Sequence, residues 1–306
     1  MQRYRAILHL IDPLVEAGHK LVIEVHCDGL NLAELRSHPT NIAYGTSKGI
    51  DYLRRNFGMH IENFEKVKFR ANASRGDIEL RLENYPHIKH NVRIPYNAHS
   101  MFFEDKEHVV GNPLSECIRK ALYKEVPDSL LIVHPGGGRG FVSPVRKKIR
   151  KSKVIYNNIV FLNEVLKNVP AHIKTIKIKT HPFPYHKCTA SSMIEHVQPH
   201  LIRDVEIVEE NLIQHMAETE WLMNFSSTTG IWLTGSPKKI INVVDSALYG
   251  GEHFRESHAD ERGGSILCGD IEAAMANYKS PWTDKDRELW ELDAVSNIME
   301  KLNERI

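Results

Sequence analysis

The feature that most constrains the fold is a regular alternation of short apolar runs with helical segments from residue 129 onward. We predict strands at 129–134, 174–180, 204–208, 220–224 and 239–244. Helices are predicted between them at 154–168, near 190–198, at 210–217 and near 229–235. Strands that alternate with helices form a parallel sheet with helices on its two faces. The C-terminal half is therefore predicted to be a doubly wound α/β domain, which a short strand at 265–268 and helices from Ile271 and Thr283 complete.

The N-terminal half is less regular. It opens with a helix, shown by apolar residues at helical spacing from Ile7 to Val15, and Gly18 is placed to end that helix. A strand is predicted at Leu21–Cys27, and no strand precedes the first helix, so either the start is late or the domain is trimmed. Further elements are predicted as a strand at 41–44, a helix at 47–57, a strand at Asn91–Asn97 and a helix from Pro113 to Lys124.

We predict two Rossmann-like domains, the first of which lacks its opening strand. The first spans 1–127 and the second 128–280, with a boundary at Val126-Pro127-Asp128. A last helix at 281–306 has apolar residues at helical spacing from Trp282 to Leu302, and we expect it to pack back across the cleft. The length of 306 residues suits two domains of about 150 residues each.

Composition excludes several classes of protein. The net charge of +1 gives no overall field that would attract nucleic acid. The basic run Arg146–Lys151 is either a solvated loop or a contact with an anionic acceptor or membrane surface. Four scattered Cys without a CxxC pair indicate neither a zinc site nor a disulfide framework. With no apolar run of 18 residues, we expect a cytoplasmic protein, with peripheral contact at the inner face of the membrane as an alternative.

Three predicted strands end in segments rich in hydroxyl, His or Gly residues. His134–Gly140 (HPGGGRG) follows the first strand, Thr180-His181-Pro182 the second, and Phe225–Gly230 (FSSTTG) the fourth. Ligands of open α/β sheets bind outside the carboxyl ends of the strands. We therefore expect these segments to line one crevice, with chemistry that suits a phosphorylated ligand.

Each segment has a functional and a plain structural interpretation. Gly136, Gly137 and Gly138 would free backbone N–H groups for an anion beside Arg139, or form a flexible turn. No Gly-Lys-Ser/Thr follows, so this is not a P-loop. Thr180 and His181 would donate to a phosphate, or His181 is a surface or capping residue.

The later segments leave similar alternatives. Ser226, Ser227, Thr228, Thr229 and Gly230 open a predicted helix, where hydroxyls either cap the first turn or bind phosphate. Four consecutive hydroxyls exceed what one cap needs. Glu209 and Glu210 end a strand, where a carboxylate would accept from a ribose diol or simply favour the helix dipole.

Together these motifs resemble the C-terminal, donor-binding half of GT-B glycosyltransferases over roughly residues 129–245. The likeness is to the bacterial group with an HP motif and a later Ser-Ser/Ser-Thr motif, which includes sialyl- and polysialyltransferases, capsular Kdo transferases and CDP-glycerol glycerophosphotransferases. The resemblance implies that His181, Ser226 and Ser227 hold the nucleotide phosphate. The segment SSTTGIWLTGSPKKIINVV also looks like the family's Ser…Gly…Leu…Gly-x-Pro-x-Ile run, which leads into the next strand.

The N-terminal half departs from this pattern. An acidic general base of the sialyltransferases lies in an Asp/Glu-Asp/Glu-Gly motif, and only Cys27-Asp28-Gly29 stands here. Asp28 and His99 are the first candidates for the general base, and Glu104 and Asp105 are the second choices. The non-hydrolysing epimerases that share the fold have paired Glu residues where this chain has Ile231-Trp232-Leu233.

The resemblance implies a metal-independent glycosyltransferase without a cofactor, which takes a CMP-, CDP- or UDP-linked donor and a glycan or lipid-linked acceptor. No DxD motif ends a predicted strand, which agrees with that expectation. A sugar-nucleotide hydrolase or epimerase-like enzyme, and a nucleotide-sugar-binding protein of polysaccharide assembly without turnover, are the alternatives.

Overall fold

The computed structural model describes residues 8–24, 54–55, 58, 60–70, 79–81, 93–97, 102–104, 109–121, 123–133, 162–179, 204–224, 228–244 and 266–304. Its contacts divide the chain into two compact units. Unit 1 combines Met1–Ala121 with Lys285–Ile306, and unit 2 is Leu122–Asp284.

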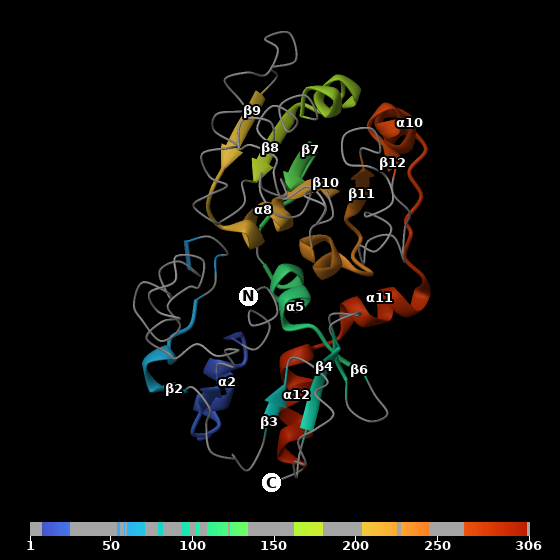
Figure 1. Cartoon of the computed structure of the whole chain (residues 1–306). Coiled ribbons are helices and arrows are strands. Elements are labelled where there is room, and N and C mark those ends of the chain that lie inside the picture. Colours follow the sequence, from blue (N-terminus) through green and yellow to red (C-terminus); the bar gives the residue numbers. More distant parts are fainter. Residues whose placement is uncertain are drawn as a thin grey trace, which may run out of the picture. The chain divides into compact units, whose positions relative to one another are not determined.

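Unit 2 is built on a six-stranded sheet in the order β12-β11-β10-β7-β8-β9 (Figure 1). Every neighbouring pair of strands is parallel, which confirms the predicted α/β fold with a parallel sheet. The strands are β7 (Val126–Val133), β8 (Thr175–Lys179), β9 (Asp204–Val208), β10 (Thr219–Asn224), β11 (Lys239–Val244) and β12 (Ile266–Leu267).

The strand order reverses between β7 and β10. From β7 the chain adds β8 and β9 on one side, and then returns to add β10, β11 and β12 on the other side. The register pairs Val133 at the end of β7 with Asn224 at the end of β10. The two strands on either side of the reversal therefore end at the same level of the sheet.

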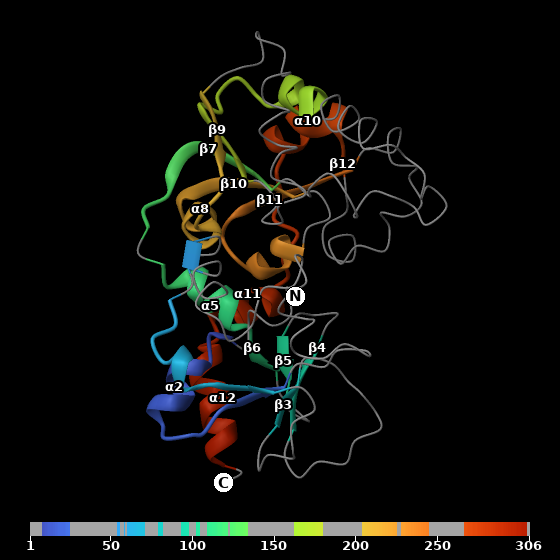
Figure 2. The same cartoon turned by 60° about the vertical axis from the view of Figure 1, so that its left-hand side comes forward.

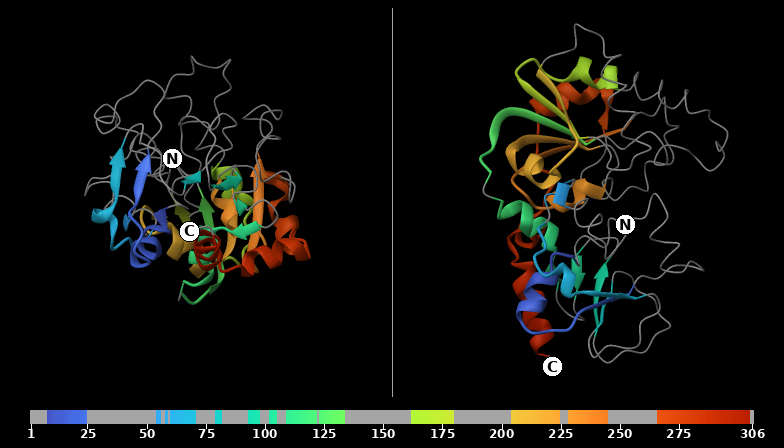
Figure 3. Two further views of the ribbon diagram at one scale, coloured as in Figure 1. Left: turned by 90° about the horizontal axis from the view of Figure 1, so that it is seen from below. Right: turned by 90° about the vertical axis from the view of Figure 1, so that its left-hand side faces the viewer.

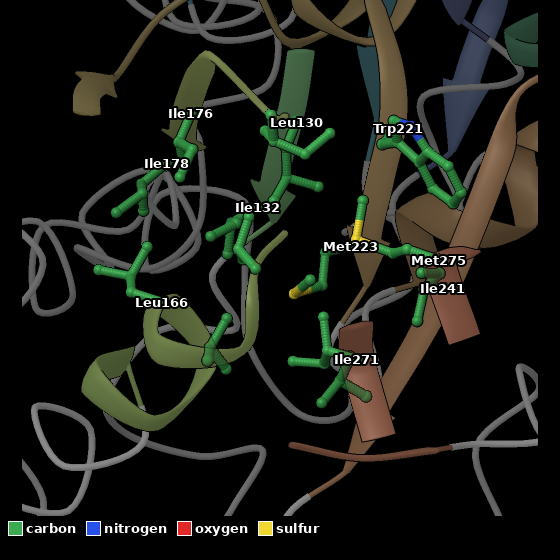
Figure 4. Close-up of a cluster of buried hydrophobic side chains, with 14 of the residues drawn as sticks. Leu130, Ile132, Leu166, Ile176, Ile178, Trp221, Met223, Ile241, Ile271 and Met275 are labelled. Carbon is green, nitrogen blue, oxygen red and sulfur yellow. The ribbon is translucent and has the colours of Figure 1, made fainter. Parts of the chain in front are cut away.

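One face of this sheet is covered by the helical residues 162–168 and by α10 (Ile271–Ala276). Side chains alternate between the faces of a strand, so Leu130 and Ile132 point to this side while Leu131 points to the other. The buried cluster on this face is shown in Figure 4 and contains Leu130, Ile132, Leu162, Val165, Leu166, Val169, Ile173, Ile176, Ile178, Trp221, Met223, Ile241, Val243, Ile271 and Met275. Burial of each large apolar side chain contributes about 1.5–3 kcal/mol to folding.

The opposite face is covered by α8 (Leu212–Glu218). The Nζ of Lys177 in β8 donates to the Glu218 carboxylate at 3.2 Å, which joins the helix to this side of the sheet. The views in Figures 2 and 3 show α8 and α10 on different sides of the strands. Helices on both faces agree with the alternation of the sequence.

The helix predicted near 229–235 is a 3₁₀ helix, η4 (Thr228–Leu233). It is short because Gly235 follows at φ +79°, a conformation that ends a helix. Within it Trp232 is fully buried and fixes the segment against the unit. A second 3₁₀ turn, η5 (Cys268–Asp270), leads into α10. The helix predicted near 190–198 lies outside the described residues.

Unit 1 contains α2 (Ile11–Glu16), which ends before Gly18 at φ +88° as predicted, and the 3₁₀ turn η1 (Phe64–Lys66). β1 (Val22–Glu24) and β2 (Lys68–Arg70) form a parallel pair. A four-stranded sheet follows in the order β3-β4-β5-β6, and its members are β3 (Glu79–Arg81), β4 (Arg93–Asn97), β5 (Phe102–Glu104) and β6 (Val109–Gly111).

The pairing in this second sheet is mixed. β3 and β4 are parallel, whereas β4, β5 and β6 pair antiparallel. Among the described residues of unit 1, the strands do not form one parallel sheet. The structure thus shows one doubly covered parallel sheet, and it does not show the second Rossmann-like domain that we predicted.

The last helix of the sequence prediction is broken into α11 (Asp284–Glu291) and α12 (Ala294–Asn303), so the prediction of one continuous helix is wrong. The break at Leu292 and Asp293 is held by α5 (Pro113–Arg119). Arg119 donates to the Leu292 carbonyl at 3.1 Å and to the Asp293 carboxylate at 2.9 Å. The buried Glu116 carboxylate accepts from the Val295 amide at 2.8 Å, which satisfies a free N–H at the start of α12. α12 then packs against α2, α5 and β6 within unit 1 (Figure 2).

Unit 1 also contains a half-buried His–Cys pair, with His9 Nδ1 and Cys117 Sγ 3.1 Å apart. Burial lowers the pKa of His9 to about 4, and the Asp12 carboxylate opposes part of that shift. Burial also raises the pKa of the Cys117 thiol to about 12, and the Glu116 carboxylate adds to the rise. Both side chains are therefore neutral in the folded protein at neutral pH.

Unit 1 is expected to lose stability as the pH falls from about 6.5 to about 4. In that window His9 is protonated in the unfolded chain and neutral in the folded protein. Proton binding therefore favours the unfolded chain, and the free energy of unfolding falls as the pH falls. The difference between the two pKa values corresponds to about 3 kcal/mol. The measurement is the urea dependence of Cys117 labelling by a dipyridyl disulfide, which reacts across this pH range.

The matched variants are His9→Leu and His60→Gln. His9→Leu should flatten the pH dependence, whereas replacement of His60, an exposed residue of the same unit, should leave it in place. A parent protein whose unit 1 is equally stable at pH 6.5 and pH 4 would contradict the assignment of His9 as a neutral group in the folded protein.

Candidate functional site

The carboxyl edge of the unit 2 sheet carries polar side chains in its last complete row. The strand register places Val208, Lys179, Val133, Asn224 and Asn242 side by side across β9, β8, β7, β10 and β11. Neighbours in register share a face, and this is the face that α8 covers, because Lys177 lies two residues before Lys179. Three of these five residues are polar, and Lys179 and Asn224 among them are buried.

Lys179 ends β8 and is buried, with 3% of its surface exposed. Its Nζ donates to the Glu209 carbonyl at 2.8 Å. A buried ammonium group needs such acceptors, because desolvation of an unpaired charge is costly. The contact ties the end of β8 to the chain that leaves β9.

That chain contains two of the predicted site residues. Glu209 is half-buried and Glu210 is exposed, in the turn between β9 and α8. The cap of α8 is Asn211, at φ +47°, whose side-chain oxygen accepts from the Gln214 amide, and the first turn of α8 contains no acidic residue. The helix therefore has its own cap, and the two carboxylates lie before it at the sheet edge.

Asn224 and Asn242 form the second polar feature of the edge. The Asn224 side chain is fully buried, and its Nδ2 donates to the Asn242 Oδ1 at 3.0 Å. Asn242 is half-buried. The pair joins β10, at the reversal of strand order, to the neighbouring β11.

Gly230 lies against Asn224. A Cβ at position 230 would stand 2.7 Å from Asn224 Nδ2 and 3.0 Å from Asn224 Cγ. Real Cβ atoms essentially never approach other atoms so closely, so the position accepts glycine alone without a shift of Asn224. Gly230 is thus a predicted site residue with a structural role, which is to leave room for the Asn224 side chain. Thr228 begins η4, two residues earlier.

Other predicted site residues lie outside the described residues. They are Asp28, His99, Gly136, Gly137, Gly138, Arg139, Thr180, His181, Ser226 and Ser227. The strands that precede three of their segments are described, and those strands end at Val133, Lys179 and Asn224. The prediction of strands before these segments is confirmed, and the roles of the segments stay predictions.

Asn224, Asn242 and Lys179 were not predicted as site residues from the sequence. Each is a polar residue within or directly after an apolar strand pattern, in EWLMN, KIINVV and TIKIK. A polar side chain at the carboxyl end of a buried strand is the signal that could have identified them, because such a side chain needs a hydrogen-bond partner.

Within the described ranges, no group of three His, Cys, Asp or Glu side chains could hold a metal ion. In the same part of the chain, no helix has the length and apolar character needed to cross a membrane. No protein-family model matches the chain, and a search of curated proteins finds no match.

Proposed function

We propose that unit 2 binds a nucleotide-activated sugar or polyol phosphate at the carboxyl edge of its sheet, and that the protein transfers this group to a glycan acceptor as a GT-B glycosyltransferase. The observation that carries the proposal is the reversal of strand order between β7 and β10. Numbered within unit 2, the strands run 3-2-1-4-5-6, the order of doubly wound nucleotide-binding sheets, whose ligands bind where the order reverses.

The sequence also favours the carboxyl edge of the sheet as the binding site. HPGGGRG begins directly after β7 and FSSTTG directly after β10, so the chain leaves both strands beside the reversal with phosphate-binding residue types. Glu209 and Glu210 follow β9 at the same edge, where a carboxylate would accept from a ribose diol. The resemblance of residues 129–245 to GT-B donor domains makes a nucleotide-linked donor the preferred ligand.

In the proposed reaction the acceptor hydroxyl attacks the donor while the nucleotide leaves. Negative charge develops on the leaving phosphate, and donors fixed in position stabilise such charge. Arg139, His181 and the hydroxyls of Ser226 and Ser227 are assigned to that role. Asp28 or His99 is assigned to remove the acceptor proton.

The test begins with binding. Isothermal titration with CMP, CDP, UDP and UDP-N-acetylglucosamine should give saturable binding of at least one nucleotide, and a ligand at about a hundred times its Kd should add about 2.7 kcal/mol to the stability of unit 2. Binding of none of them would overturn the proposal.

Turnover of the bound donor then decides the reaction. A transferase releases nucleotide only when an acceptor is added. Release without acceptor would make the protein a sugar-nucleotide hydrolase, and binding without release would make it a non-catalytic binding protein.

A further inference from the structure

The hydrogen bond between Asn224 and Asn242 sets the orientation of both amides. The Nδ2 of Asn224 donates to the Oδ1 of Asn242 at 3.0 Å. The opposite arm of the same amide is the Nδ2 of Asn242, which carries two N–H donors. Asn242 therefore turns its oxygen towards Asn224 and its donors away from it.

Those donors are accessible to a ligand. Among the described residues the structure records no partner for the Nδ2 of Asn242, and this atom is not among the buried polar atoms that lack a partner. The side chain is half-buried, in contrast to the fully buried Asn224. Asn242 thus presents N–H groups at the surface of the edge, one strand from the reversal of strand order.

Gly230 restricts the movement of the Asn224 amide. The Asn224 amide packs so closely on Gly230 that a Cβ there would lie 2.7 Å from its Nδ2. Gly230 ends the FSSTTG segment. Asn242, Asn224 and Gly230 therefore link β11, β10 and η4. This link holds the N–H groups of Asn242 in place without a positively charged side chain.

We propose that Asn242 is a binding residue of the site, whose side-chain NH₂ donates to a phosphoryl oxygen of the bound nucleotide, and that Asn224 is the positioning residue that holds this amide in its donating orientation. The inference rests on the proposed function, since it names a contact of the same ligand. A phosphoryl oxygen accepts hydrogen bonds and cannot give them, so the orientation of Asn242 decides whether the contact attracts or repels.

The test uses Asn242→Asp in the full chain. The carboxylate introduced there still accepts from Asn224 Nδ2, so the link between β10 and β11 remains. A phosphoryl oxygen then meets a carboxylate oxygen in place of an N–H. The affinity for CDP or UDP, whichever the parent binds, and for inorganic pyrophosphate is expected to fall by about 30-fold or more.

The matched control is Asn277→Asp. Asn277 lies in the same unit, is exposed, and donates its Nδ2 to the Ala273 carbonyl. The control introduces the same charge away from the sheet edge, so its nucleotide affinity should stay within about twofold of the parent.

Asn224→Asp tests the positioning role. The carboxylate that this variant places beside Asn242 cannot donate, so the Asn242 amide must turn its NH₂ towards that carboxylate and present its oxygen to the ligand. The loss of nucleotide affinity should approach that of Asn242→Asp, although Asn224 is fully buried. A residue that only supports the fold would lower the melting temperature without weakening phosphate binding in the folded protein.

The outcomes separate the two proposals. If the parent binds neither nucleotide nor pyrophosphate, the proposed function fails. If the parent binds and Asn242→Asp binds equally well, the inference about Asn242 fails while the proposed function stands. Should Asn242→Asp not fold, the neutral Asn242→Ser, which keeps an oxygen for Asn224, replaces it; unchanged affinity in that variant would overturn the inference, and a loss of about fivefold or more would support it.

Discussion

Gly111→Ala is expected to destabilise unit 1 by about 2–5 kcal/mol, through two independent costs. The first is backbone strain. Gly111 ends β6 at φ +109°, a conformation that side-chain-bearing residues rarely adopt. The second is a clash: a Cβ at this position would stand 2.9 Å from Ala294 Cβ and 3.2 Å from Leu292 Cβ. The glycine therefore allows the break between α11 and α12 to lie directly on β6.

Gly18→Ala is the control that separates these costs. Gly18 has a similar φ of +88° in the same unit, and a Cβ there would meet nothing within 4 Å. Its replacement should cost only the backbone term, about 1–2 kcal/mol. Hydrogen exchange of peptides from each unit is the measurement, because two units need not unfold in one transition. Equal effects of the two replacements would contradict close packing of α12 on β6.

A double variant tests the contact directly. Ala294→Gly removes the atom that the new Cβ would approach most closely. It should cost less in the Gly111→Ala background than in the parent, by about 1 kcal/mol, because residues in contact do not contribute additively.

The sheet of unit 2 could be predicted closely from the sequence. Strands 204–208 and 239–244 were predicted with the bounds that the structure shows. Strand 204–208 alternates polar and apolar residues, which suits a half-buried strand at the edge of the sheet. Strand 239–244 is mostly apolar, which suits a strand inside a parallel sheet. The order of the strands could not be predicted, because it depends on which edges pair in space.

The C-terminal helices show where local patterns fail. Apolar spacing continues through Leu292, so the sequence predicts one helix. The break depends on Arg119, which lies 173 residues before Leu292 in the chain and takes its carbonyl out of the helical pattern. Such a tertiary contact overrides propensity and leaves no signal within the segment itself.

The sequence located the edge of the sheet, because strand ends are visible in the apolar pattern, and the roles of the predicted site residues at that edge stay predictions. It did not identify Asn224 and Asn242, since their meaning depends on the register that places them opposite each other across β10 and β11. Gly230 was predicted as part of a phosphate-binding segment, and the structure adds that its missing side chain makes room for Asn224.

Gly230→Ala is expected to have the largest effect on the candidate site. The new Cβ cannot fit beside Asn224, which is fully buried and hydrogen-bonded to Asn242, so the Asn224 amide must move. Overpacking of this kind costs about 1–3 kcal/mol in the stability of unit 2. The shift also frees the Asn242 amide, so the affinity for the nucleotide should fall by about tenfold or more. Calorimetric titration of the folded variant and hydrogen exchange of β10 peptides measure the two effects.

Gly269→Ala is the matched control for this prediction. Gly269 lies in η5 of the same unit, is exposed, and a Cβ there would meet nothing within 4 Å. Its replacement should leave both stability and nucleotide affinity near those of the parent. If Gly230→Ala were as stable and bound the nucleotide as tightly as this control, Asn224 would have room to move without consequence. In that case the Asn224–Asn242 pair could not be what orients donors at the sheet edge, and the phosphate contacts would have to come from the loops alone.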